Sequence, residues 1–361
     1  MKTWVRGLGW TLAGLVALFM IVIFDFLRHG GQFKSLKPQF AGTCTAIPLA
    51  ASAEDIQIDR VRGVAYLSYL DRRGQIEGKR VLGTVMLLDL NVPEPRPRPA
   101  LSNEPPNFRP HGMSLYRAGD GSQRLFAISH LPDGEQAIEV FEQTPTGAFA
   151  PIRTIRDPLL LKPNAMVAVG PNQFYVANDS GAHGKLQRVT ELLFRRGLST
   201  IAYFDGQKMR AVATGLKSAS GIAVSPDASR IYVSETSGNR LAVYARNAGT
   251  GDLSFVEHVE LGSAPDNLSV DGDGTVWIAA HAKVLALARH FGDANKRSPT
   301  QVFRWRPGSG AATANGARPE VIYLNLGEQL SAGSGAATFR DQLLIGSITE
   351  HKVLQCRLPP G

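Results

Sequence analysis

Behind a long apolar run near the N-terminus, the hydrophobic and polar positions repeat one pattern along the chain. A short strand that opens on a polar residue leads into a turn with Gly, Pro or Asp, and then into a second strand of β-branched and aromatic residues. In one copy, residues 220–224 lead through Pro226 and Asp227 to residues 231–233. The copies, of which the first and last are the weakest, open at Glu54, His111, Asn164, Ser220, Asn267 and Ser334.

Successive copies begin about 50 to 70 residues apart, which is the size of a repeat built from hairpins. Six such copies predict an all-β fold, a six-bladed β-propeller that fills residues 38–361 with no second domain. Residues 1–37 then form a separate N-terminal segment. The 37 glycines and 22 prolines fit a chain with many turns between short strands.

The polar residue that opens each copy has a predictable place, because the innermost strand of every blade lines the central channel. We therefore expect the opening residues of the first five copies, together with Asp266, to converge at one end of that channel. Carboxylate, amide and hydroxyl oxygens gathered in one place are ligands suited to Ca²⁺. The alternative is that the Asn and Ser side chains only satisfy the backbone of turns.

Residues 7–24 are 18 consecutive uncharged positions, at the short end of what a helix needs to cross a bilayer. Asp25 and Arg28 follow directly, with no small-x-small cleavage site, so we expect an uncleaved signal-anchor helix more than a cleaved signal peptide. Half of the net charge of +8 lies here, because residues 1–37 hold five Lys or Arg and one Asp. No basic run stands out elsewhere, so the charge indicates a membrane flank and argues against a nucleic-acid partner.

The chain has two cysteines, Cys44 and Cys356, at the two ends of the predicted propeller. A bond between them would fasten the ring at its closing blade and would place the domain in a non-cytosolic compartment, periplasmic, extracellular or lumenal. The alternative is two buried free thiols.

At these residues the sequence resembles the paraoxonase/arylesterase family of calcium-dependent six-bladed propellers, more distantly related to gluconolactonases and strictosidine-synthase-like proteins. The resemblance runs from about Cys44 to Cys356. It rests on FRPHGMS at 108–114, PNAMVAVGP at 163–171, AND at 177–179, SPD at 225–227, DNLSVD at 266–271 and LLIG at 343–346. A hydrophobic N-terminus that is not cleaved and a disulfide joining the two ends are traits of the family.

The resemblance implies a catalytic calcium held by Glu54, Asn164, Asp266 and Asn267, with Ser220 at a fifth ligand position. It implies a histidine dyad of His111 and His130. It also assigns Asp55 to a structural calcium, and Met113 is a further candidate metal-site residue.

Two positions depart from the family pattern. Ser220 replaces an Asn and is a shorter, weaker ligand. Ala165 replaces an Asp that binds the structural calcium, which argues against a second metal ion.

The chemistry implied is hydrolysis of lactones or aryl esters, with Ca²⁺ polarising the carbonyl and His111 taking a proton from the attacking water. His130 would orient His111 or relay its proton, and Asp266 is an alternative base. His281 ends another apolar strand and is interpreted as a wall residue. The alternative functions are a non-hydrolytic calcium-binding propeller of the strictosidine-synthase-like kind and a gluconolactonase-type sugar lactonase.

Residues 186–196 carry apolar side chains on one helical face and charged ones on the other. This pattern predicts a helix at the channel side that is either a lid or membrane-contacting element, or an ordinary cap packed on the propeller.

Overall fold

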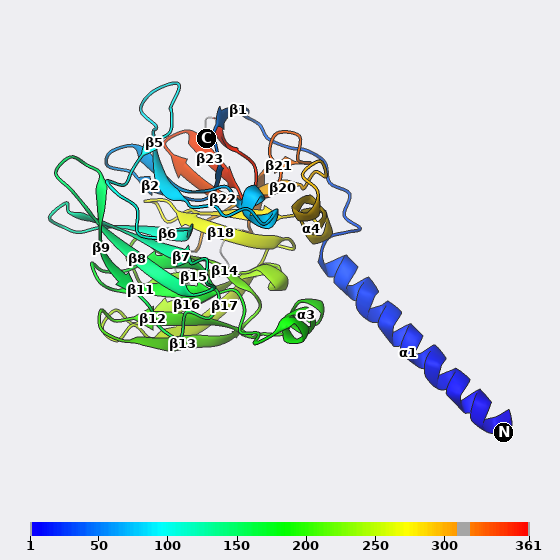
Figure 1. Cartoon of the computed structure of the whole chain (residues 1–361). Coiled ribbons are helices and arrows are strands. Elements are labelled where there is room, and N and C mark those ends of the chain that lie inside the picture. The colour runs from blue at the N-terminus through cyan, green and yellow to red at the C-terminus, as the bar shows by residue number, and fades with distance from the viewer. Residues whose placement is uncertain (1, 309–317, 360–361) are drawn as a thin grey trace.

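Six antiparallel sheets of four strands each occupy the chain from residue 43 to residue 357. The computed structural model describes residues 2–308 and 318–359. The sheets surround a central axis as the blades of a propeller, and a long helix projects from one side of the ring (Figure 1). The predicted all-β six-bladed propeller and its N-terminal apolar helix are therefore confirmed.

From the inner strand outward, blade 1 consists of β2 (Ser52–Asp59), β3 (Val64–Leu70), β4 (Thr84–Asp89) and β5 (Arg98–Pro99). Blade 2 consists of β6 (Pro110–Arg117), β7 (Gln123–His130), β8 (Gln136–Gln143) and β9 (Phe149–Ile155). Blade 3 consists of β10 (Pro163–Ala168), β11 (Phe174–Asn178), β12 (Ser199–Phe204) and β13 (Met209–Leu216). Blade 4 consists of β14 (Ala219–Val224), β15 (Arg230–Glu235), β16 (Arg240–Arg246) and β17 (Leu253–Glu260). Blade 5 consists of β18 (Ala264–Val270), β19 (Val276–His281), β20 (Thr300–Trp305) and β21 (Glu320–Asn325). Blade 6 consists of β22 (Gly333–Phe339), β23 (Gln342–Ser347), β24 (Lys352–Arg357) and β1 (Thr43–Pro48). The helices are α1 (Lys2–His29), α2 (Arg72–Ile76), α3 (Lys185–Leu193), α4 (Val284–Gly292) and the short 3₁₀ turn η1 (Thr236–Gly238).

The ring closes through its last blade, because β1 forms the outer strand of blade 6 and pairs antiparallel with β24. This pairing places Cys44 directly opposite Cys356, and the two sulfur atoms form a disulfide. The predicted disulfide is thus confirmed, and the alternative of two free thiols is wrong. The bond joins residues 312 positions apart and holds the two ends of the propeller together.

Among the described residues, the hydrophobic core forms six clusters, each between two neighbouring blades. Between blades 3 and 4, for example, Tyr175 and Tyr203 belong to the same cluster as Ile222 and Val233. Each blade buries both of its faces, so second strands such as β19 are apolar at nearly every position instead of alternating.

All six inner strands carry an irregularity at the same place, near their first residues. In each blade the register between the first and second strands shifts there, so that one or two residues of the inner strand are left out of the pairing. A bulge of this kind turns the side chain of the unpaired residue away from the regular strand positions. The unpaired residues are Glu54, Asp55, His111, Gly112, Asn164, Ser220, Asp266, Asn267 and Ser334.

Neighbouring inner strands approach one another closely at these bulges. A Cβ atom on Gly112 would lie 2.4 Å from the carbonyl oxygen of Asn164, and one on Gly221 would lie 2.2 Å from the carbonyl oxygen of Asp266. Both are closer than a real side chain can come, so glycine is required for the strands to meet. The glycine after the opening polar residue therefore sets the width of this end of the channel.

The helices lie at the same end of the ring as the bulges. The second strand of each blade runs antiparallel to the first, so the connections from second to third strand return to the end where the inner strands begin. These connections carry α2, α3, η1 and α4. Figure 1 shows α1 leaving the propeller from the side that carries α3 and α4.

The last turn of α1 is fixed to this face. His29 Nε2 lies 2.9 Å from the carbonyl oxygen of Ser237, and Asn239 Nδ2 donates to the carbonyl oxygen of His29 at 2.8 Å. Asp25 pairs with Arg195, just beyond α3, at 2.5 Å. Residues 10–29 are long and apolar enough to cross a membrane, and none of that stretch is buried against the propeller.

The predicted helix at residues 186–196 is present as α3. Its apolar side chains Leu186, Val189 and Leu192 point outward and are exposed, whereas Glu191 is buried. Glu191 accepts hydrogen bonds from Ser180 and Arg188 underneath the helix. α3 is therefore held to the propeller by its polar face, unlike an ordinary packed cap.

Candidate active site

The unpaired residues of the inner strands meet at the helix-bearing end of the channel. Asn267 Nδ2 donates to Glu54 Oε1 at 2.9 Å, across from blade 5 to blade 1. His111 Nε2, from blade 2, lies 3.5 Å from the same Glu54 oxygen. Residues far apart in the sequence are therefore in direct contact, and Glu54 is at their centre.

The two predicted dyad histidines are joined. His111 Nδ1 lies 3.0 Å from His130 Nε2, with the ring centres 4.7 Å apart and the ring planes nearly perpendicular. His130 ends β7, and its Nδ1 is hydrogen-bonded to Gln136 Oε1 at the start of β8. The imidazoles thus form a chain that leads from the channel end toward the outer part of blade 2.

Asp266 is paired with a histidine that the sequence analysis assigned to the channel wall. His281 Nε2 lies 3.0 Å from Asp266 Oδ2, and its Nδ1 is buried with no hydrogen-bond partner. His281 ends β19 as His130 ends β7, at the same place in the second strand of its blade. Aligning the copies on their second strands would have found it.

A buried arginine also reaches the site, and no sequence pattern indicated it. Arg72 begins α2 and is 6% exposed. Its Nη2 donates to the carbonyl oxygen of Pro110 at 2.9 Å and lies 3.5 Å from Glu54 Oε2. The position of this guanidinium depends on how α2 folds over the channel, which a local sequence window does not contain.

Burial controls the charges at this site. Loss of solvent raises the pKa of Glu54 to about 8, and the nearby charges of Asp266 and Asp55 add to that effect while Arg72 opposes it. Burial also raises the pKa of Asp55 to about 6. For the imidazoles burial acts in the opposite direction, so the pKa of His130 falls to about 4 and that of His111 lies well below 6.5.

The remaining predicted ligands, Asn164 and Ser220, differ in whether their side-chain oxygen is engaged in a well-formed hydrogen bond. The Asn164 amide oxygen is buried and makes no hydrogen bond of good geometry, and the Asn164 side chain lies close enough to His111 to raise the pKa of that imidazole against the effect of burial. The Ser220 hydroxyl is instead 2.5 Å from that of Thr236 and donates to the carbonyl oxygen of Pro265 at 3.2 Å. The structure therefore does not bring Ser220 into contact with the site carboxylates.

Comparison with known proteins places this site in a family. The family model described as Arylesterase matches residues 75–358. The chain belongs to the arylesterase family. Serum paraoxonase/arylesterase 1 of Rattus norvegicus is 28% identical over 97% of this chain and 99% of that protein. Serum paraoxonase/arylesterase 2 of Gallus gallus is 30% identical over 76% of this chain, and serum paraoxonase/lactonase 3 of Rattus norvegicus is 26% identical over 96%.

Solved structures agree with the arylesterase chain in fold. A luciferin-regenerating enzyme superposes with a TM-score of 0.53 at 12% identity, over 88% of this chain and 95% of that one. An aldose sugar dehydrogenase from Streptomyces coelicolor gives a TM-score of 0.51 at 14% identity, over 89% and 99%. The arylesterase and paraoxonase relatives are hydrolases across nearly the full length, so this chain is an enzyme of that kind.

The donor set of this arylesterase fits a first calcium ion and does not fit a second. Glu54, Asn164, Asp266 and Asn267 offer carboxylate and amide oxygens, the donors that Ca²⁺ prefers. Amides make up half of that set, and no group of three or more His, Cys, Asp or Glu side chains in the described part of the chain forms a metal-holding cluster.

At the position expected for a second, structural calcium ion, the Asp55 carboxylate already has hydrogen-bond donors on both oxygens. Its Oδ2 accepts from the backbone N–H of Met113 at 2.6 Å, its Oδ1 accepts from that of Ile56 at 2.7 Å, and the Gln57 amide contacts both oxygens at 3.3 Å. Met113 thus presents an N–H to Asp55, and Ala165 on the neighbouring inner strand has no oxygen to offer. These contacts leave Asp55, predicted for a structural calcium, and Met113, a further predicted metal-site residue, bonded to each other beside Ala165.

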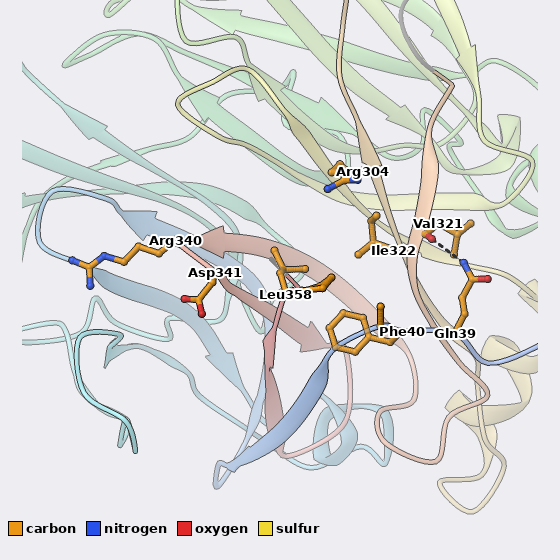
Figure 2. Close-up of a pocket in the computed structure, with 10 residues that line it drawn as sticks. Gln39, Phe40, Arg304, Val321, Ile322, Arg340, Asp341 and Leu358 are labelled. Atoms are coloured by element: carbon orange, nitrogen blue, oxygen red, sulfur yellow. Dashed lines mark hydrogen bonds between the residues drawn. The ribbon is translucent and has the colours of Figure 1, made fainter. Parts of the chain in front are cut away.

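Another hollow of this arylesterase lies away from the channel-end site. A groove of about 790 Å³ runs between β21 and blade 6, and it shares no lining residue with the channel-end site. Figure 2 shows Phe40 and Leu358 facing Ile322 across it, with Arg340 directed away from the apolar part. Its lining has no titratable pair comparable to the histidine dyad.

Proposed function

We propose that the protein hydrolyses lactones or aryl esters at the helix-bearing end of the channel, and that this activity needs one calcium ion. The observation that carries the proposal is the Asn164 amide oxygen, which is buried beside His111 and makes no hydrogen bond of good geometry. Buried acceptors without donors are rare in folded proteins and call for a ligand. The buried carboxyl groups of Glu54 and Asp266 lie there as well, and a bound cation would stabilise their ionised forms.

Glu54, Asn164, Asp266 and Asn267 would hold the calcium ion. When bound, the ion would act as a Lewis acid that polarises the substrate carbonyl and stabilises the oxyanion that forms on it. Asn267 currently turns its amide N–H toward Glu54, so its amide would have to rotate for its oxygen to serve as a ligand.

The hydrogen bonds around the dyad support His111 as the base. Gln136 donates its amide N–H to Gly134, so its oxygen faces His130 and accepts from Nδ1–H. In this arrangement His130 Nε2 accepts a hydrogen bond from His111 Nδ1–H. His111 Nε2 then carries no proton, and its lone pair lies at the channel end. The low pKa of His111 keeps it in this neutral form.

His111 Nε2 would take a proton from the attacking water, and the Nδ1 proton would pass to His130. The imidazolium charge would then lie on His130, the second ring of the pair, which is farther from the channel end than His111. Asp266, held by His281 at 3.0 Å, is the alternative base for the same step.

A second candidate keeps the fold and omits the hydrolysis. Because the Ser220 hydroxyl is engaged by Thr236 and Pro265, the calcium site would lack its fifth protein ligand. That observation favours a calcium-binding propeller of the strictosidine-synthase-like kind. A gluconolactonase-type sugar lactonase is less favoured, because the paraoxonase relatives match nearly the whole chain, including its N-terminal segment.

We further propose that residues 1–37 anchor the enzyme to a membrane and that residues 38–361 form the catalytic propeller on its non-cytosolic side. Three observations support this: α1 can span a bilayer, the disulfide fits an oxidising compartment, and the exposed apolar side chains of α3 lie on the face from which α1 projects. Substrates would therefore reach the site from the membrane side.

The test is hydrolysis of phenyl acetate and of a medium-chain lactone by the full-length protein in detergent. We expect turnover to disappear after chelation and to return with calcium, and Asn267→Ala to abolish it. Calcium binding without turnover of either substrate would favour the second candidate. Turnover that persists after chelation would contradict the calcium requirement.

A further inference from the structure

Arg72 is a cation buried near Glu54 and Asp266, the two carboxylates that would bind calcium, and near Asp55. The exposed fractions of Glu54, Asp55 and Asp266 are 2%, 5% and 7%, and that of Arg72 is 6%. The guanidinium charge interacts with all three carboxylates. A positive charge this close and this poorly solvated acts on any other cation that enters the same space.

The guanidinium is placed there by contacts on both sides. Inside the channel its Nη2 binds the carbonyl oxygen of Pro110, directly before His111, and contacts Glu54. The same nitrogen lies 3.5 Å from the Ser68 hydroxyl of β3, whereas its Nε is buried with no acceptor. Arg72 thus links the bulge of blade 1 to that of blade 2 without a full set of acceptors of its own.

α2 itself is fastened across the ring. Arg73, the next residue, donates to the carbonyl oxygens of His290 and Phe291 in α4, each at 2.9 Å. His290 is in turn 2.7 Å from the Thr349 hydroxyl of blade 6. Asp71 caps the first turn of α2 and lies 3.2 Å from His351. Because α2 is tied to blades 5 and 6, Arg72 cannot swing away from the site at little cost.

We propose that Arg72 is a positioning residue that sets the calcium affinity of the site to a low value while holding Glu54 and the backbone before His111 in place. This inference rests on the proposed calcium-dependent function. The fixed positive charge takes over part of the neutralisation of the carboxylates, so calcium gains less on binding than it would among the carboxylates alone. The structure makes the two roles inseparable, because one nitrogen makes both contacts.

The sign of the effect follows from charge alone. A calcium ion brings two positive charges and displaces at most one proton from the carboxylates. Removal of the guanidinium charge therefore favours the calcium-bound state, even where a carboxyl group is protonated beforehand. A single charge at this range changes binding equilibria by about tenfold or more.

The test is calorimetric titration of the full-length protein in detergent with calcium chloride, for wild type, Arg72→Met and Arg72→Lys. We expect the calcium Kd of Arg72→Met to fall by about tenfold while its kcat at saturating calcium also falls, because the contact with Pro110 is lost. Arg72→Lys keeps the charge, so its Kd should stay within about threefold of wild type. Arg72→Gln replaces Arg72→Met if the latter does not fold, as judged by its thermal melt.

Arg73→Met is the matched control, since it loosens the same helix without removing charge from the site. An unchanged or higher Kd in Arg72→Met would overturn the proposal, and so would an equal tightening in Arg73→Met, because the helix and not the charge would then be responsible. Absence of calcium binding by the wild type is a different failure, since it would remove the proposed function itself.

Discussion

At the scale of single residues, the imidazole pair is held in one protonation pattern by an amide. Gln136 presents its amide oxygen to His130, while its amide nitrogen donates to the carbonyl oxygen of Gly134. The proton positions of both histidines follow from that one constraint. Neutral His111 is the form that the proposed mechanism uses as the base, and burial favours that form by lowering the pKa of the imidazole.

This protonation pattern predicts the acid side of the pH profile. The pKa of His111 lies well below 6.5 and that of His130 falls to about 4, so the base is lost only when the pH falls through those values. We expect kcat/KM at saturating calcium to be level between pH 7 and pH 8 and to decline only below about pH 6. Gln136→Glu, which places a carboxylate on His130, should move this decline to higher pH. A wild-type midpoint at or above 6.5 would contradict the assignment.

Glu54 predicts a second pH effect, in binding instead of catalysis. Its pKa is raised to about 8, so the carboxyl group is protonated at pH 7 and must ionise to become a calcium ligand. Calcium binding at pH 7 should therefore release about one proton, and the apparent affinity should increase as the pH rises toward 8. Titrations in two buffers of different ionisation enthalpy measure the release. Identical heats in both buffers would show that Glu54 is already ionised.

At the scale of elements, the bulges of the inner strands build the site. Each bulge removes one or two residues from strand pairing, and those residues are the ones that carry the polar groups. The glycines that follow three of them allow neighbouring strands to approach to the distances seen. The site is therefore a property of strand geometry as much as of residue type.

Gly112→Ala tests this directly. The new methyl group would lie 2.4 Å from the Asn164 carbonyl oxygen and 2.6 Å from the Ala165 Cα, so the strands must separate. We expect a loss of about 1–3 kcal/mol in stability, together with weaker calcium binding, because Asn164 moves. Gly119→Ala is the control, since a methyl group there meets nothing within 4 Å and the backbone is unstrained. Equal melting temperatures for Gly112→Ala and wild type would show that the close approach is not needed.

The elements also show where prediction from the sequence stops. The spacing of the copies is enough to predict six blades, because each hairpin needs a fixed length of chain. The convergence of Glu54, His111 and Asn267 follows from that topology and is found. Arg72 was missed because its place depends on α2 folding across the ring, and Ser220 was placed among the ligands although its hydroxyl bonds to Thr236.

At the scale of the whole molecule, the ring is closed by one strand and one covalent bond. The pairing of β1 with β24 and the disulfide between Cys44 and Cys356 secure the same blade. The sequence left the disulfide and two free thiols as alternatives, since cysteine positions alone do not show which strand completes the last blade. The structure resolves the alternatives, because the pairing of β1 with β24 places the two cysteines opposite each other.

Loss of this bond should loosen the ring without changing its blades. A crosslink across 312 residues stabilises a chain by about 4–5 kcal/mol in the loop-entropy model. We expect Cys44→Ser with Cys356→Ser to lower the melting temperature by several degrees while the β-sheet circular dichroism signal at 20 °C is retained. Reduced wild type should melt like the double variant. Coincident melting of oxidised and reduced protein would contradict a stabilising role.

The account depends most on a single calcium ion at the channel end. The direct measurement is the number of calcium ions bound per chain by the full-length protein, compared with Asn164→Ala, in which the buried amide oxygen is removed. One calcium ion per wild-type chain, and its loss in Asn164→Ala together with ester and lactone turnover, is the predicted result. Two calcium ions per chain, none at all, or one that survives in Asn164→Ala would contradict it.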